Sequence, residues 1–228
     1  LKDSTPVLMP WIDDAASVIE VWNQGTEDGH VVADLIFGVV NPSGKVPTTY
    51  MRNEEDSIYY NNPERWPGVD EGEGFPTITY SEGLNMGYRW FQTQGIKPMF
   101  GFGYGLSYTT FEVSDVSVDK ATYDGGPVTV KATVTNTGDR EGAEVVQVYL
   151  GVPSKNQPPK RLVGFAKAKL EAGASETVEI VIDPAATNHP FSVWSDCAHD
   201  FVVPCGVFTV YVGTSADETP YVFTIANN

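Results

Sequence analysis

The chain of 228 residues carries 30 acidic and 14 basic residues, giving a formal net charge of −16, and 41% of its residues are hydrophobic. Such an excess of negative charge repels a phosphate backbone and gains nothing from counterion release, so we expect no nucleic-acid partner. No run approaches the ~18 apolar residues of a membrane span, so we expect no membrane partner either, and the length allows two domains of ordinary size.

The first segment with a clear period covers residues 12–22. Its apolar side chains recur at helical spacing, and Asp13 and Asp14 stand early, where the helix dipole favours anions. The sequence therefore predicts an amphipathic helix. The apolar positions are Ile12, Ala15, Ala16, Ile19 and Trp22.

A second helix is predicted to begin after Thr26 as N-cap and to end at Gly38, which suits the left-handed conformation at a helix C-terminus. Its apolar face holds Val32, Leu35 and Ile36. A short strand is predicted over residues 46–50. Residues 53–74 follow, rich in acidic residues, Gly and Pro and without apolar periodicity, which predicts a long surface loop.

Beyond residue 111 the pattern changes to strict two-residue alternation, which marks strands with one buried face. Turn residues separate these runs and no helical pattern intervenes, as in a β-sandwich of immunoglobulin or fibronectin III type. We therefore predict an α/β domain over residues 1–111 and an all-β sandwich over residues 112–228. The alternating apolar sets are Val128, Val130, Ala132 and Val134; Val146, Val148 and Leu150; Val178, Ile180 and Ile182; and Phe208, Val210 and Val212.

The two cysteines, Cys197 and Cys205, flank a short segment between strand-like runs. A turn there would bring them within disulfide range, so we predict a Cys197–Cys205 disulfide. The alternatives are two unpaired thiols and, least favoured, a zinc site, because two cysteines with only His199 nearby leave the zinc ligand shell incomplete. His30, His189 and His199 show neither metal-ligand spacing nor a triad arrangement, so we expect no metal and no cofactor.

The stretch FGFGYGLSYTTF, residues 100–111, places three glycines between aromatic side chains. A dinucleotide fingerprint needs a different third spacing and a following helix, and a Walker loop needs a Lys after its last glycine, where this chain has Leu106. Both phosphate-binding interpretations fail. We predict instead that the glycines let the backbone pass close to bulky aromatic side chains at the junction between the two domains.

Several stretches occur in a characteristic order: PW (10–11), WNQGTEDG (22–29), ADLIFGVVNPSGKVPTTY (33–50), YSEGLNMGYRWF (80–91) and FGFGYGLSYTTF. Together they resemble the C-terminal part of glycoside hydrolase family 3, the β-glucosidase and β-xylosidase family. The stretches at 160–180 and 205–218 resemble the fibronectin III-like domain that closes many longer members. One departure is residues 23–29, where the family usually has a Pro-Gly-Gln-Glu-Gly-Gly type of turn; Glu27 still stands at a helix start, so we interpret a tolerated change of cap.

The resemblance implies a retaining, exo-acting β-glycosidase, extracellular or periplasmic, that acts on β-linked oligosaccharides or aryl glycosides. Its catalytic Asp, on a TIM barrel, and its acid/base Glu are both expected before Leu1, in a longer product. Glu82 and Glu73 are the weak candidates this chain offers. We interpret Glu82 as a structural carboxylate paired with Arg89, and the acidic turn around Glu73 as solvated.

This chain would then be inactive alone and would support the barrel and the first part of the sandwich domain of the same protein. Residues 1–111 hold too few strands to form the sheet that their two helices would cover, so they are expected to pack against a preceding segment that supplies the missing strands. For Tyr80, Tyr88 and Trp90, packing is favoured over a sugar platform. The alternative function is a non-catalytic carbohydrate-binding module, although Phe191, Trp194, Tyr211 and Phe223 form no stripe on a single predicted strand.

Overall fold

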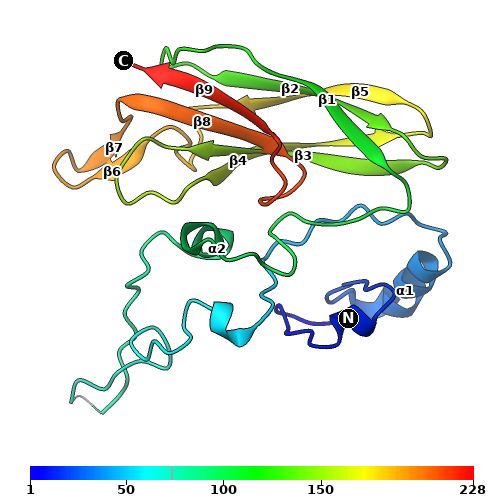
Figure 1. Cartoon of the computed structure of the whole chain (residues 1–228), viewed down its shortest axis with the longest axis horizontal. Helices are drawn as coiled ribbons and strands as arrows, with labels where there is room; N and C mark the ends of the chain where they lie inside the picture. The colour runs from blue at the N-terminus through cyan, green and yellow to red at the C-terminus, as the bar shows by residue number, and fades with distance from the viewer. Residues whose placement is uncertain (73) are drawn as a thin grey trace.

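The computed structural model of the protein describes residues 1–72 and 74–228. A β-sandwich lies along one side of the molecule, and a part made largely of loops, with helices α1 and α2, lies along the other (Figure 1). The sandwich has one sheet of order β1-β2-β5, a second of order β4-β3-β8-β9, and a separate β6-β7 pair. Its strands are β1 (Phe111–Val118), β2 (Val128–Asn136), β3 (Gly142–Gly151), β4 (Arg161–Leu170), β5 (Ser175–Ile182), β6 (Val193–Ser195), β7 (Asp200–Val202), β8 (Gly206–Gly213) and β9 (Tyr221–Asn227).

The alternating runs of the sequence form the inner faces of the two sheets, as predicted. In β2 the side chains of Val128, Val130 and Val134 are fully buried, and the antiparallel register sets Val130 opposite Ile180 of β5. Because successive side chains of a strand point to opposite faces, this register turns the whole apolar set of each strand inward. The hydrophobic core assembled in this way draws all its residues from Phe111 onward.

The part before β1 contains little regular structure. Its elements are α1 (Asp28–Ile36), α2 (Tyr88–Gln94) and short 3₁₀ helices at Ile12–Asp14, Gly25–Glu27 and Glu54–Asp56. The fold class predicted from the sequence, a partial α/β domain followed by a β-sandwich, is confirmed. Residues 53–72 form the predicted loop of turns, and none of the helices in the described residues is long and apolar enough to cross a membrane.

The helix predicted over residues 12–22 is wrong. After the 3₁₀ turn Ile12–Asp14, residues 15–24 form no helix or strand, and this segment bonds to the first residue: the Leu1 amine donates to Ile19 O at 2.7 Å and Val21 N donates to Leu1 O at 3.0 Å. The stretch contains Val18, Ile19 and Val21, whose β-branched side chains favour extended backbone. The early aspartates favour only the single 3₁₀ turn.

The second helix is confirmed as α1, with a different start. Thr26 lies within the 3₁₀ turn Gly25–Glu27 that runs into α1, and Glu27 occupies the N-cap without a capping hydrogen bond from its side chain. Gly38 ends the helix with φ +69°, as predicted. Of the predicted apolar face, Ile36 points to solvent rather than to a packed neighbour.

The strand predicted over residues 46–50 forms no regular strand in the described structure. Tyr50 makes an isolated antiparallel bridge to Phe100, and Val46 N donates to Tyr104 O at 2.8 Å. A β-ladder needs hydrogen bonds to a partner strand along its whole length. Residues 100–104 bond to this segment only at Val46 and Tyr50. Residues 46–50 therefore run beside the glycine-rich stretch without forming a sheet.

The connection into the sandwich is fixed at several consecutive residues. Tyr108 N donates to Asn41 Oδ1 at 2.8 Å, and Tyr108 Oη donates to Leu35 O at 2.9 Å. Thr109 Oγ1 donates to Asn136 Oδ1 at 2.8 Å in a buried position. The chain thus enters β1 bound on one side to the α1 region and on the other to the sandwich.

Candidate functional site

The structure describes only one of the two weak catalytic candidates, Glu82. Glu73 lies outside the described residues. The Glu82 side chain is 8% exposed and lies against Arg65, with 3.5 Å between Arg65 Nε and Glu82 Oε2. The predicted pairing of Glu82 with Arg89 is therefore wrong, since the ion-pair partner of Glu82 in the structure is Arg65, while the structural role is retained.

The aromatic residues near Glu82 divide between packing and exposure. Tyr88 stacks on Phe102 at a centroid distance of 4.9 Å, and its hydroxyl accepts the Leu162 N–H at 2.8 Å. Trp90 donates its indole N–H to Asp56 O at 3.0 Å. These two are packed, as predicted, whereas Tyr80 is exposed.

The glycine-rich stretch lies close against the sandwich at residues 101–105, which we call the glycine junction. A Cβ atom at each of its three glycines would meet a neighbour well inside 3.0 Å. The neighbours are Asp217 for Gly101, Gln147 for Gly103 and the carbonyl of Gly44 for Gly105. Close approach of the backbone, and not phosphate binding, is the role of these glycines, as predicted.

Gln147 of β3 connects the glycine junction to the sandwich. Its Nε2 donates to Gly103 O at 3.0 Å and also to Thr214 O, while its Oε1 accepts the Tyr149 hydroxyl hydrogen bond at 2.6 Å. Gln147 is buried, so these partners satisfy an amide that would otherwise lose its hydration without replacement. Nearby, Ala216 N donates to Phe102 O at 2.8 Å.

Charged groups also cross the junction. Lys45 Nζ lies 2.7 Å from Glu144 Oε1, and both side chains are largely buried. Lys160 Nζ lies over the rings of Tyr149 and Tyr211, 5.3 and 5.0 Å from their centroids, and donates to Thr219 Oγ1 at 2.7 Å. Burial lowers the pKa of Lys160 to about 8, although the negative charge of Asp217 acts in the opposite direction and raises this pKa. Burial likewise raises the pKa of the Asp217 carboxyl.

The depressed pKa of Lys160 predicts a pH dependence of stability. Between about pH 8 and pH 10.5 the unfolded chain holds the Lys160 proton and the folded chain has released it, so the free energy of unfolding rises with pH in this window. We expect wild type to gain stability relative to Lys160→Met across this window, and the difference to be flat from pH 6 to 7. Urea denaturation of both proteins at pH 6, 7, 8.5 and 10 measures it; a constant difference throughout would show that Lys160 is fully solvated.

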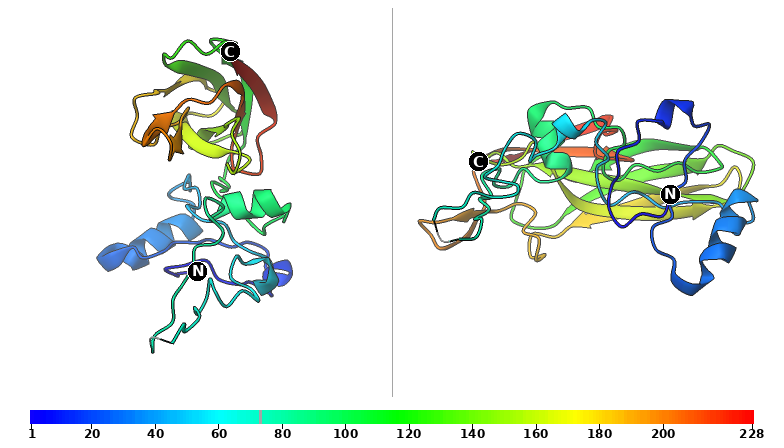
Figure 2. Two further views of the ribbon diagram at one scale, coloured as in Figure 1. Left: turned by 90° about the vertical axis from the view of Figure 1, so that its left-hand side faces the viewer. Right: turned by 90° about the horizontal axis from the view of Figure 1, so that it is seen from below.

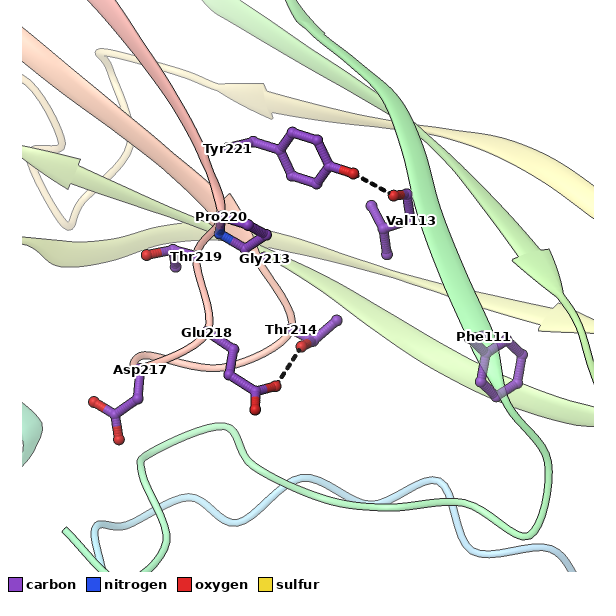
Figure 3. Close-up of a pocket in the computed structure, with 9 residues that line it drawn as sticks. All are labelled: Phe111, Val113, Gly213, Thr214, Asp217, Glu218, Thr219, Pro220 and Tyr221. Carbon is purple, nitrogen blue, oxygen red and sulfur yellow. Dashed lines mark hydrogen bonds between the residues drawn. The ribbon is translucent and has the colours of Figure 1, made fainter. Parts of the chain in front are cut away.

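A shallow pocket of about 550 Å³ opens between β1 and the turn that joins β8 to β9 (Figure 3). At one end Tyr221 points toward Val113, and at the other the acidic side chains of Asp217 and Glu218 stand on the turn. The Thr214 hydroxyl donates to Glu218 Oε2 at 3.2 Å, so Glu218 is held by its own turn. We interpret this pocket as a surface depression beside the glycine junction.

The predicted disulfide is not formed: Cys197 and Cys205 are both free and exposed. Ser195 pairs with Asp200 and Val193 with Val202, so Cys197 lies in the hairpin turn while Cys205 follows the opposite end of the hairpin. The turn separates the two thiols instead of bringing them together. Among the described residues no group of three or more His, Cys, Asp or Glu side chains is placed to hold a metal ion.

We therefore expect two reactive thiols in the native, non-reduced protein. An exposed thiol without a partner reacts readily with a maleimide, whereas a disulfide does not. Mass spectrometry after labelling without reductant should count two adducts, and Cys197→Ser and Cys205→Ser should each remove one. Zero adducts before reduction and two after it would show that Cys197 and Cys205 form a disulfide in the protein.

Two families match successive parts of the chain. The glycosyl hydrolase family 3 C-terminal domain matches residues 1–108, and the fibronectin type III-like domain matches residues 144–216. A thermostable β-glucosidase B from Acetivibrio thermocellus is 39% identical over 221 residues, which is 96% of this chain. The chain therefore matches the C-terminal part of glycoside hydrolase family 3 proteins.

Other known proteins align over a similar range. An exo-α-(1→6)-L-arabinopyranosidase from Bifidobacterium longum is 40% identical over 94% of the chain. The crystal structure of a β-glucosidase from Streptomyces venezuelae in complex with D-glucose superposes with a TM-score of 0.88 at 35% identity, covering 97% of this chain. The chain spans only about a quarter of these proteins: 28% of the A. thermocellus relative, 27% of the B. longum relative and 27% of the S. venezuelae chain.

The departure from the family 3 pattern at residues 23–29 is accommodated locally. Glu27 stands at the start of α1, as interpreted from the sequence, and its Oε2 lies 2.7 Å from His30 Nδ1. Gly25 adopts φ +72° with open space around it. The turn therefore keeps its acidic residue at the positive end of the helix dipole.

Proposed function

We propose that this chain is the C-terminal part of a retaining, exo-acting β-glycosidase and contributes structure and not catalytic groups. The match to family 3 proteins over nearly the whole chain is the observation that carries the proposal. A retaining mechanism needs two carboxyl groups about 5 to 5.5 Å apart, one as nucleophile and one as acid and base. In our proposal both come from sequence that precedes Leu1 in the complete protein.

The contribution of this chain follows from where its apolar side chains lie. Among the residues that the structure describes, the buried hydrophobic ones that precede the sandwich are Met9, Tyr50 and Phe91. Around the C-terminus of α1 a group of large apolar side chains is exposed instead: Ile36, Phe37, Val39, Val40 and Leu106. A patch of this kind marks a surface that another part of the protein covers. We propose that the barrel and the first part of the sandwich domain cover it.

We propose the division of the chain at residues 1–111 and 112–228. The first residue of β1, Phe111, already packs on the sandwich core, while residues before it contribute nothing to that core. The β-sandwich then supports the α/β part through the glycine junction. The complete protein would act outside the cytoplasm, in the extracellular space or the periplasm, where β-linked polysaccharides are degraded.

Glucose is the sugar that the names of the relatives favour, and xylose is the alternative within the family. The test compares the complete polypeptide with residues 1–228 on aryl β-glucosides and aryl β-xylosides. We expect hydrolysis by the complete polypeptide alone, with the glucoside preferred. Hydrolysis by residues 1–228 alone would overturn the proposal, and a preference for the xyloside would reverse the choice of sugar.

Substitution of the two carboxylates provides a second test. In the complete polypeptide, Glu82→Gln and Glu73→Gln should change kcat by less than about tenfold, because loss of a group that transfers the proton typically lowers the rate by about 10² to 10⁴. A decrease of that larger size, with an unchanged melting temperature, would place the carboxylate in the catalytic machinery.

A further inference from the structure

The β6–β7 hairpin projects from one end of the sandwich and lies outside both large sheets (Figures 1 and 2). It carries two large aromatic side chains, Trp194, which is 54% exposed, and Phe201, which is 40% exposed. They are cross-strand partners, with their ring centroids 5.4 Å apart in an edge-to-face arrangement. Neither belongs to the hydrophobic core, so packing of the sandwich does not explain them.

These rings are held in place by their neighbours. The indole Nε1–H of Trp194 donates to Asp196 Oδ1 at 2.9 Å. The imidazole ring of His189 lies flat against Phe201, with centroids 3.6 Å apart and an interplanar angle of 6°. We call Trp194, Phe201 and His189 the hairpin platform. These contacts already order the rings. The binding of a ligand that stacks on Trp194 therefore costs little additional side-chain entropy.

We propose that the hairpin platform is a surface site for a neutral β-linked polysaccharide, a ligand class that rests on the proposed function of the complete protein. One face of a β-linked pyranose carries axial C–H groups and packs flat on an aromatic ring, while its hydroxyls at the rim need hydrogen-bond acceptors. The exposed indole of Trp194 supplies the ring. Asp196 uses Oδ1 for the indole, which leaves Oδ2 for a sugar hydroxyl.

Charge selects against other polymers. Asp196 and Asp200 flank the rings, and the chain as a whole carries a net charge of −16. A polyanion, such as a uronate-rich polysaccharide, meets repulsion at this site, whereas a neutral glucan or xylan does not. The platform lies in the fibronectin III-like part, so it would hold a polymer beside the enzyme and raise the local concentration of chain ends.

The experiment measures retention of the complete polypeptide on insoluble cellulose and xylan, with excess glucose present to occupy the active site. We expect Trp194→Ala to reduce the retained fraction about fivefold, as the loss of one aromatic contact would, and Trp194→Phe to retain part of the binding. The matched control is Phe165→Ala, which removes an aromatic ring that is 65% exposed on β4 and should leave retention unchanged.

Other outcomes would overturn the site. Equal retention of wild type and Trp194→Ala would do so, as would retention of residues 1–228 but not of the complete polypeptide, which would show that the rest of the protein covers the hairpin. Hydrolysis of a soluble aryl glycoside is measured in parallel and should be the same for both proteins. Retention that depends on Trp194 in a protein that hydrolyses no glycoside would overturn the proposed function and leave the site standing.

Discussion

Replacing Gly103 by Val should destabilise the protein by about 2 to 5 kcal/mol, the sum of a strained backbone and an overpacked contact. Gly103 has φ +81°, which a β-branched residue resists, and its added Cβ would overlap the side-chain amide of Gln147. That amide cannot move aside without leaving Gly103 O and Thr214 O without their donor. Urea denaturation of the complete polypeptide, followed by intrinsic fluorescence, measures the loss.

Gly125 supplies the matched control. It has φ +83°, nearly the same backbone conformation, but no atom lies within 4 Å of its added Cβ. Gly125→Val should therefore carry the backbone strain without the clash and destabilise by about 1 to 3 kcal/mol. If Gly103→Val and Gly125→Val were equally destabilising, close packing against Gln147 would not be the reason for the glycine.

Because Thr109 bonds to Asn136 and Phe111 packs on the sandwich core, the pieces for this test are cut before Thr109 and not at the proposed boundary after residue 111. Residues 1–108, expressed without the rest of the polypeptide, should fail to fold, whereas residues 109–228 should melt cooperatively as a monomer. The sandwich contains the whole hydrophobic core, from Phe111 to Ile225. In the described residues before it, Met9, Tyr50 and Phe91 are buried, and the apolar group around the end of α1 is exposed. Burial of apolar surface must offset the entropy of ordering the chain, and residues 1–108 bury too little of it.

Circular dichroism, thermal melting and size exclusion of each piece provide the measurement. We expect a sharp transition for residues 109–228 and no transition, or aggregation, for residues 1–108. Adding the N-terminal remainder of the complete polypeptide in trans should restore a transition to residues 1–108. A cooperative, monomeric melt of residues 1–108 alone would contradict the idea that a preceding segment completes this part.

The β-sandwich was predictable because apolar and polar residues alternate strictly along its strands. When one face is buried, this two-residue period fits a β-strand and fixes which side chains face the core. In the segment at residues 12–22 the spacing of Ile12, Ala15 and Ile19 fits a helix, but the local preference of Val18, Ile19 and Val21 for extended backbone prevails. The helix α2 gave no comparable pattern, since its few residues are mostly aromatic or polar and it is defined by packing of Tyr88 on Phe102.

The glycine junction was predictable as a place of close approach, but its partners were not. Nothing in the spacing of Gly101, Gly103 and Gly105 identifies Asp217, Gln147 or Gly44, because these contacts join residues far apart in sequence. The same holds for Glu82, whose partner Arg65 lies in the preceding loop. The disulfide failed for a related reason: proximity in sequence placed the cysteines on one hairpin, and the register of that hairpin separated them.

The way in which residues 104–110 enter β1 leaves no hinge between the two parts of the chain. Tyr104 is bound by Val46, Gly105 by Lys45, Ser107 and Tyr108 by Asn41, and Thr109 by Asn136, so little of the backbone between residues 104 and 109 is without a hydrogen-bonded neighbour. A free linker would let the sandwich tumble on its own. Here we expect the sandwich and the α/β part to rotate together as one rigid body. The fluorescence anisotropy of a fluorophore on β9 should therefore decay with the rotational correlation time of the complete protein and show no separate nanosecond component.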